Sequence, residues 1–168
     1  MMSNVILADT NILSTFAKVG RISLLLQLLK ANRLGVTPAV YEEFQIGVTK
    51  GYTVLQPVID LIEQEQIELL VPNAQEILQK SALPSSFDTG ERETLIVARS
   101  RSLGVLTNER HVKNWCLREQ VETWDLPGIL RALWRHNVIN REQVRRLIEE
   151  IEAKDRVVFR NKEQILAE

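Results

Sequence analysis

Short runs of consecutive apolar residues alternate along this chain with longer segments of helical periodicity, and this alternation restricts the fold more than any other feature. The first run, Val5–Ala8, is apolar on both faces of a strand and ends at the polar triplet Asp9-Thr10-Asn11. A strand without a polar face is typical of a parallel sheet with helices above and below it. Further strands are expected at 34–36, 67–71, 104–107 and 121–124. The sequence therefore predicts an α/β fold, a three-layer α/β/α sandwich around a central parallel sheet.

The segments between these runs carry helix start signals. Thr37 and Pro38 mark a helix start after the second strand, because proline suits the first turn of a helix. Asn73 with Glu76, and Asp88 with Glu91, have the spacing of a capping box. We expect helices at 12–18, 22–29, from 38 through 44, at 54–64, from 73, at 88–100, 108–117, from 125, at 141–154 and at 162–167.

Length and composition indicate one globular domain. The 168 residues are 45 % hydrophobic and 26 % charged, which excludes a disordered chain. No repeat or Gly/Ser linker interrupts the pattern. We expect a single domain over 1–168, with a core at about 1–125 and a C-terminal helical extension at about 126–168.

The charge balance and the single cysteine exclude several classes of protein. With 21 basic and 22 acidic residues, the net charge is −1, so any nucleic-acid binding must be local. Cys116 has no cysteine with which to form an internal disulfide, as expected for a reducing compartment. The N-terminal apolar run is too short for a signal peptide, and no apolar stretch approaches the roughly 20 residues of a membrane span. We expect a cytoplasmic protein that does not contact membranes.

Four acidic residues fall at one edge of the predicted sheet. Asp9 ends the first strand, Glu43 lies early in the helix after the second, and Glu109 follows the 104–107 strand. Glu93 lies in the first turns of the helix that precedes that strand. Carboxylates gathered in this way repel one another unless a cation neutralises them, and oxygen ligands suit Mg²⁺ or Mn²⁺. The pattern predicts metal-assisted phosphoryl chemistry with an activated water.

Each acid also has a structural interpretation. Asp9 could simply cap the helix that follows it, and Glu43 and Glu93 could be solvated helix residues. The capping box explains Glu91, so the sequence does not assign Glu91 to the metal. Because Glu91 and Glu93 are two residues apart on a helix, they point in different directions, and only one should face the site.

Four segments in order resemble the motifs of the PIN domain family. They are 4–13 with 16–21 after it, 36–44, 90–98 and 105–110. They cover roughly the first three-quarters of the chain, and four motifs in order are more specific than any one alone. The remainder, through 158–166, is similar to the tail of a prokaryotic PIN subgroup described as predicted nucleic-acid-binding proteins.

The resemblance implies a fold, a chemistry and partners. PIN domains are α/β/α sandwiches, many are Mg²⁺- or Mn²⁺-dependent ribonucleases, and many prokaryotic members resemble VapC, the toxin of a toxin–antitoxin pair. RNA, an antitoxin protein and a second copy of the chain in a homodimer are the partners to consider. The family's catalytic, metal-binding acids fall on Asp9, Glu43, Glu93 and Glu109, with Thr10, Asn11, Thr107 and Asn108 in support.

The chain departs from the family pattern at two of these positions. Glu93 and Glu109 stand where the family more commonly has Asp, and the extra methylene moves the carboxylate. The alternative hypothesis is therefore a catalytically weak or inactive PIN-fold module that binds RNA or a protein partner. A phosphatase or receiver-like domain is less consistent, because Asn11 stands where the second Asp of Asp-x-Asp would be.

Basic residues cluster locally near the fourth motif and in the C-terminal part. Arg110 and Lys113 follow Glu109 and are the candidate RNA-binding residues. His111 and His136 have the pattern of surface or helix-end residues. The apolar stripe of the 141–154 helix, made by Val144, Leu147, Ile148 and Ile151, could pack against the domain itself or form a dimer or antitoxin surface.

Overall fold

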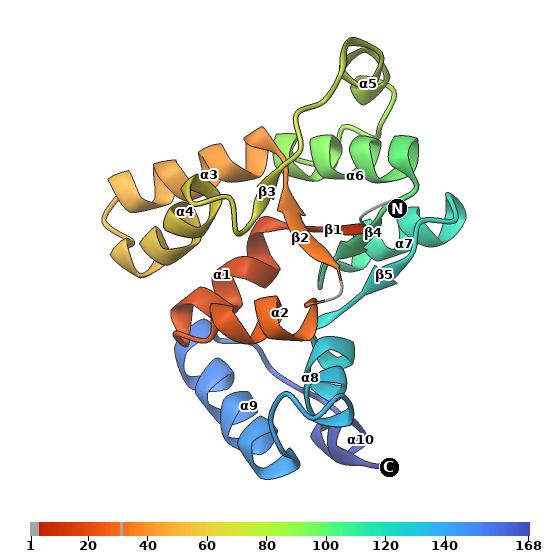
Figure 1. Cartoon of the computed structure of the whole chain (residues 1–168). Helices are drawn as coiled ribbons and strands as arrows, with labels where there is room; N and C mark the ends of the chain where they lie inside the picture. The colour runs from red at the N-terminus through yellow and green to blue at the C-terminus, as the bar shows by residue number, and fades with distance from the viewer. Residues whose placement is uncertain (1–3, 31) are drawn as a thin grey trace.

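The computed structural model, which describes residues 4–30 and 32–168, is built on a five-stranded parallel sheet with helices on both faces (Figure 1). The strand order is β3-β2-β1-β4-β5. The predicted α/β sandwich with a parallel sheet is confirmed. The strands are β1 (Val5–Ala8), β2 (Arg33–Val36), β3 (Glu68–Leu69), β4 (Gly104–Leu106) and β5 (Thr123–Trp124).

The strand order places a topological switch at the centre of the sheet. The chain leaves β1 towards β2 and β3, then returns to β4 on the other side of β1. Leu7 of β1 is in register with Gly35 on one side and Val105 on the other. Ligands of open parallel sheets bind beyond the carboxyl ends of the strands at such a switch, so the segments after β1 and β4 are where a site is expected.

Helix boundaries follow the predicted segments with small differences. The expected helix at 54–64 is divided into a 3₁₀ turn, η1 (Thr53–Leu55), and α4 (Gln56–Glu63), because Pro57 lies in the first turn of α4 and has no amide hydrogen to continue a helix through. The helix expected from Asn108 begins instead at Arg110, with Glu109 in the N-cap position. The remaining helices are α1 (Thr10–Lys18), α2 (Ile22–Leu28), α3 (Pro38–Thr49), α5 (Ala74–Lys80), α6 (Thr89–Arg101), α7 (Arg110–Arg118), α8 (Leu126–Arg135), α9 (Arg141–Asp155) and α10 (Lys162–Leu166).

The sheet separates two hydrophobic cores. Ile6 and Ala8 of β1 join the larger core with helices that include α1, α2, α4, α8 and α9. Val5 and Leu7, which point to the opposite face, join the smaller core with α6 and α7. Burial on both faces explains why β1 is apolar throughout.

The C-terminal extension packs against the larger core. Val144, Leu147, Ile148 and Ile151 are buried there, so the apolar stripe of α9 packs within the domain. Asp155 at the end of α9 forms a 2.7 Å ion pair with Lys18 of α1 and also accepts a hydrogen bond from Thr15. None of the helices in the described part of the chain is long and apolar enough to cross a membrane.

A buried ion pair attaches α5 to α6. Glu76 is 1 % exposed, and its carboxylate accepts hydrogen bonds from Arg101 Nε at 3.1 Å and Nη2 at 2.8 Å. The same Nη2 donates to the carbonyl of Val71 at 2.8 Å. The hydrogen bonds from Arg101 hold the pKa of Glu76 below its ordinary value, despite the opposing effect of burial.

We predict that Arg101→Met destabilises the protein by about 2–3 kcal/mol at neutral pH, because it leaves the Glu76 carboxylate buried without its partner. The pKa of Glu76 is lowered by folding, so the pair stabilises the protein above the unfolded-state pKa. This contribution is lost as the pH falls through the lowered folded-state value. Urea unfolding of the variant and wild type checks this. Arg145→Met, at an exposed helical position, is the matched control and should change stability by less than about 0.5 kcal/mol. Equal effects of the two substitutions would contradict the prediction.

Candidate metal centre

Asp9 connects three segments at the switch point of the sheet. It follows β1 directly and is 5 % exposed. Its Oδ1 accepts a 2.9 Å hydrogen bond from the amide of Ile12, so it is also the N-cap of α1. Its Oδ2 accepts a hydrogen bond from the hydroxyl of Thr107, the residue after β4. Both interpretations of Asp9 therefore hold, since the carboxylate caps a helix and lies at the carboxyl edge of the sheet.

Glu109 is held close to Asp9 by the same threonine. Its amide donates to Thr107 Oγ1 at 3.1 Å, and its carboxylate accepts a hydrogen bond from the side-chain amide of Asn11. Thr107 thus contacts both acidic residues, and Asn11 ties the loop after β4 to the first turn of α1. The predicted supporting positions Asn11 and Thr107 orient the carboxylates in the structure.

Glu43 and Glu91 line a small pocket of about 30 Å³ next to Asp9. Asp88, Thr10 and Asn11 complete its polar lining. Gly90 forms the remaining wall, and a Cβ atom there would lie 2.2 Å from Oε1 of Glu43. The missing side chain at residue 90 is what lets the Glu43 carboxylate approach the first turn of α6.

Glu91 also belongs to a second cluster with Glu109 and His111. One ligand atom from each of these three residues lies within 4.8 Å of the others. Nε2 of His111 lies 3.1 Å from both carboxylate oxygens of Glu91, and the His111 ring packs against Phe87 with centroids 5.2 Å apart. Glu91 therefore connects the carboxylates of the small pocket to an imidazole.

Glu93 lies elsewhere in the structure. Its Oε1 accepts a 2.8 Å hydrogen bond from the amide of Ala39 at the start of α3, and its Oε2 forms a 3.2 Å ion pair with Lys80. The sequence predicts Glu93 as the third acid, whereas in the structure Glu91 lies with the other carboxylates and Glu93 contacts α3 and α5. The physical reason is that the two residues differ by about 200° around α6, so only one can face the switch point.

Two residues of this cluster were not expected from the sequence. Glu91 was assigned only to its capping box, which is present, since it accepts from the amide of Asp88 at 3.0 Å. His111 lies two residues after Glu109, in the first turn of α7. That spacing is the signal that the sequence offers for His111, because Glu109 is the N-cap residue of α7 and the first turn of the helix starts from the same loop.

The other predicted site residues lie around the centre. Thr10 lines the small pocket. The Asn108 side chain accepts a 3.3 Å hydrogen bond from the amide of Leu126, the first residue of α8. Arg110 and Lys113 line a neighbouring cleft.

Burial and mutual repulsion perturb two of the carboxyl groups. Burial raises the pKa of Asp9 to about 6, while the hydrogen bonds from Thr107 and Ile12 oppose that rise and the charge of Glu109 adds to it. Partial burial also raises the pKa of Glu43, with the charges of Asp88 and Glu91 contributing in the same direction and a hydrogen bond with Thr10 opposing them. A bound cation would reverse both effects by stabilising the ionised forms.

The donor set fits a divalent cation. Carboxylate oxygens are the preferred ligands of Mg²⁺ and Mn²⁺. The Glu43 carboxylate can reach the pocket because residue 90 is a glycine and has no side chain in its way. The raised pKa of Asp9 reflects an incompletely compensated buried carboxylate. The chain therefore has the ligands, the space and the uncompensated negative charge that a cation site requires.

The family follows from comparison with known sequences. A family model described as DUF3368, PIN domain, matches residues 5–168. This chain is a PIN domain. No curated protein matches its sequence significantly.

Solved structures agree with the fold of a PIN domain. A crystal structure of VapBC2 from Rickettsia felis, bound to a DNA fragment from the promoter, contains a chain with a TM-score of 0.57 and 17 % identity. The similarity covers 72 % of the present PIN domain and 98 % of that chain. A chain of VapBC-1 from nontypeable Haemophilus influenzae has a TM-score of 0.50 and 22 % identity, over 72 % of this chain and 97 % of that one. At these identities, the similarity concerns the fold.

We predict that Asp9→Asn stabilises the metal-free PIN domain at neutral pH by up to about 3 kcal/mol, because asparagine keeps the cap and removes a buried charge. Folding raises the pKa of Asp9, so ionisation costs stability as the pH rises through the interval from the unfolded-state value to about 6. Below that interval the stability difference between variant and wild type should disappear.

Urea unfolding in a chelator, at several values between about pH 4 and pH 7, measures this difference. Asp60→Asn, at an exposed position of α4, is the control for the loss of a carboxylate. A stability difference that stays constant over the whole range would refute the role given to Asp9 burial.

Proposed function

We propose that this PIN domain is a divalent-metal-dependent ribonuclease. The observation that carries the proposal is the meeting of four carboxylates and one imidazole, from Asp9, Glu43, Glu91, Glu109 and His111, at the switch point of the sheet. A structural role alone does not explain why a fold would gather so much negative charge around a buried carboxylate. Membership of the PIN family, many of whose members are ribonucleases, supports the same activity.

Asp9, Glu43, Glu91 and Glu109 would hold Mg²⁺ or Mn²⁺, directly or through water, and His111 would add a nitrogen ligand. The cation, when bound, lowers the pKa of a coordinated water and neutralises charge on a phosphodiester. Thr107 fixes Asp9 by its hydroxyl, and Asn11 fixes Glu109 by its amide. These hydrogen bonds prevent the two carboxylates from turning away from each other, which is how residues behind metal ligands tune a site.

We further propose that the protein acts as the toxin of a toxin–antitoxin pair. The similarity of its fold to chains in two VapBC structures supports this context. Growth arrest on expression of the chain, relieved by a small adjacent reading frame, is the result expected from such a pair. Unimpaired growth at a verified level of folded protein would count against a toxin role.

The central prediction concerns cleavage of single-stranded RNA. Wild type should cleave RNA in Mn²⁺ and lose cleavage in a chelator, and Asp9→Asn should lower the rate by at least about a hundredfold because it removes a charged ligand at the cation. Gel analysis of a labelled RNA measures the rates. Asp60→Asn removes an exposed carboxylate outside the centre and should leave cleavage unchanged.

Equal rates for wild type and Asp9→Asn, or no cleavage by folded wild type at any metal concentration, would contradict the proposed activity. If Mn²⁺ binding were also absent while RNA or protein binding remained, the chain would be a non-catalytic PIN-fold module instead.

A second prediction distinguishes Glu91 from Glu93. Glu91→Gln should weaken Mn²⁺ binding about 10–100-fold, because it removes charge from the centre while an amide oxygen can preserve the cap. Glu93→Gln should weaken it by less than about threefold, since its carboxylate contacts Ala39 and Lys80. Titration calorimetry with Mn²⁺ measures both affinities, and thermal unfolding verifies that both variants fold. The opposite order of effects would restore Glu93 as the third acid.

A further inference from the structure

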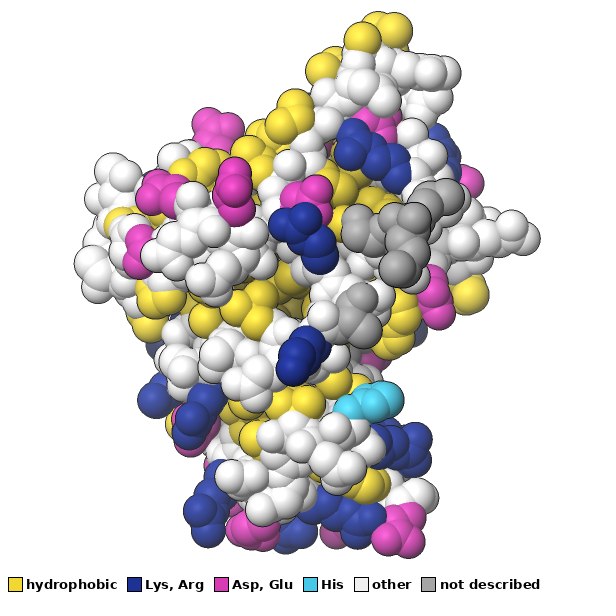
Figure 2. Space-filling model, viewed as in Figure 1, with side chains coloured by type: hydrophobic (Ala, Val, Ile, Leu, Met, Phe, Trp, Pro, Cys, Tyr) yellow, Lys and Arg dark blue, Asp and Glu magenta, His cyan; other side chains and the backbone are white. Residues whose placement is uncertain are grey.

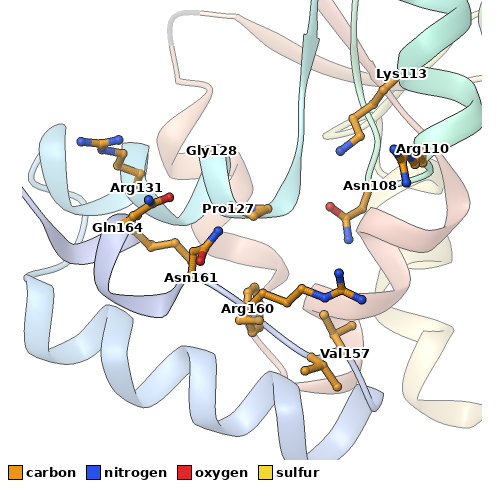
Figure 3. Close-up of a pocket in the computed structure, with 13 residues that line it drawn as sticks. Asn108, Arg110, Lys113, Pro127, Gly128, Arg131, Val157, Arg160, Asn161 and Gln164 are labelled. Atoms are coloured by element: carbon orange, nitrogen blue, oxygen red, sulfur yellow. The ribbon is translucent and has the colours of Figure 1, made fainter.

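A cleft of about 700 Å³ lies next to the metal centre, between the start of α7, α8 and the C-terminal segment 157–165 (Figure 3). Asn108 and Arg110 line it, and these residues flank Glu109 in the sequence. The cleft therefore opens beside one of the proposed metal ligands. Its other wall comes from the C-terminal extension, which carries Arg160 and Asn161.

The charge of this cleft is opposite to that of the centre beside it. Its lining contains four basic side chains and no acidic one, although the whole chain has a net charge of −1. On the face shown in Figure 2, Lys and Arg side chains also gather around the C-terminal helices. The basic residues of the lining are Arg110, Lys113, Arg131 and Arg160.

Two of these arginines are available to a ligand. Arg110 and Arg160 are exposed, and neither forms an ion pair or a side-chain hydrogen bond with the described residues 4–30 and 32–168. Figure 3 shows the Arg160 guanidinium extending across the cleft toward Asn108 and Arg110. Lys113, by contrast, is 3.3 Å from Asp125. Unpaired guanidinium groups facing one space are suited to phosphate oxygens, which they bind in bidentate fashion.

The lining also indicates how a nucleic acid would be read. The aromatic residue of the lining, Phe159, is 8 % exposed, so it offers no face on which a base could stack. Amide side chains of Asn108, Asn161 and Gln164 supply further polar contacts. The volume of about 700 Å³ lies in the range of small-ligand sites, so the cleft accommodates a short stretch of one strand. Contacts of this kind favour the backbone over particular bases.

We propose that this cleft, with one wall made by the C-terminal segment, binds the sugar–phosphate backbone of single-stranded RNA next to the metal centre. The proposal names a substrate subsite and rests on the ribonuclease function proposed above. Arg110 contacts the phosphate nearer to Glu109, and Arg160 contacts a phosphate further from the centre. Binding through these contacts depends on salt and only weakly on base sequence.

The test measures binding without cleavage. The full chain carrying Asp9→Asn, in a chelator, is titrated into a fluorescent single-stranded RNA of about 12 nucleotides, and anisotropy gives the affinity between about 50 and 200 mM salt. The variant with an altered cleft, called the groove variant, carries Arg110→Gln and Arg160→Gln in addition to Asp9→Asn. The matched control adds Arg145→Gln and Arg146→Gln, which remove the same charge from exposed positions of α9 outside the cleft.

The groove variant should bind RNA about tenfold more weakly, and its salt dependence should be flatter by about 1.4 in log–log slope, as expected for two lost phosphate contacts on a single strand. The control should retain both the affinity and the slope. Two RNAs of unrelated sequence should lose affinity to the same extent. Circular dichroism and thermal unfolding establish that both variants are folded.

Equal losses in groove variant and control, or no loss in either, would overturn the proposal. Two other results would also overturn it. One is DNA of the same sequence binding as tightly as RNA. The other is that the groove substitutions weaken the binding of an acidic polyglutamate peptide and leave RNA binding unchanged, which would assign the cleft to a protein partner. This binding measurement needs neither a metal ion nor cleavage. If the nuclease assay failed while RNA binding still depended on Arg110 and Arg160, the proposed chemistry would be wrong and the proposed RNA subsite would stand.

Discussion

The carboxylate of Asp9 holds the functional edge of this PIN domain together. Asp9 follows β1 directly, and its carboxylate caps α1 through the amide of Ile12 and accepts a hydrogen bond from Thr107 after β4. Thr107 in turn accepts from the amide of Glu109. The relative position of β1, α1 and the loop before α7 thus depends on one buried acid whose pKa is raised to about 6. The fold buries a carboxyl group whose charged form is destabilised by burial, and such groups are common in sites that bind ligands or catalyse reactions.

The sequence predicted the elements well because their signals are local. Strand β1 is apolar on both faces, and the capping boxes at Asn73 and Asp88 form as expected. The edge strands β3 and β5 are shorter than the predicted 67–71 and 121–124, since each has only one neighbour in the sheet. Periodicity does not show where hydrogen-bond pairing ends.

The site was predictable in outline and less so in detail. Asp9, Glu43 and Glu109 could be placed because the carboxyl ends of parallel strands meet at one edge. Glu91 was set aside because a capping box already explained it, yet a carboxylate has about four lone-pair positions and a backbone amide uses only one. The spacing from Glu109 puts His111 near this edge, but its approach to Glu91 depends on how α6 and α7 lie relative to each other. The cleft depends likewise on the path of an aperiodic segment.

The C-terminal segment is attached to the domain independently of the acidic edge, so the proposed substrate contacts and the proposed chemistry are separable. Trp134 of α8 donates a 2.7 Å hydrogen bond to the carbonyl of Ile165, and Phe159 and Ile165 are buried in the larger core. No hydrogen bond in the described chain joins residues 157–165 to Asp9, Glu43, Glu91 or Glu109. Substitutions in this tail could therefore change the proposed contacts of the cleft with a phosphate backbone while the acidic edge stays unchanged.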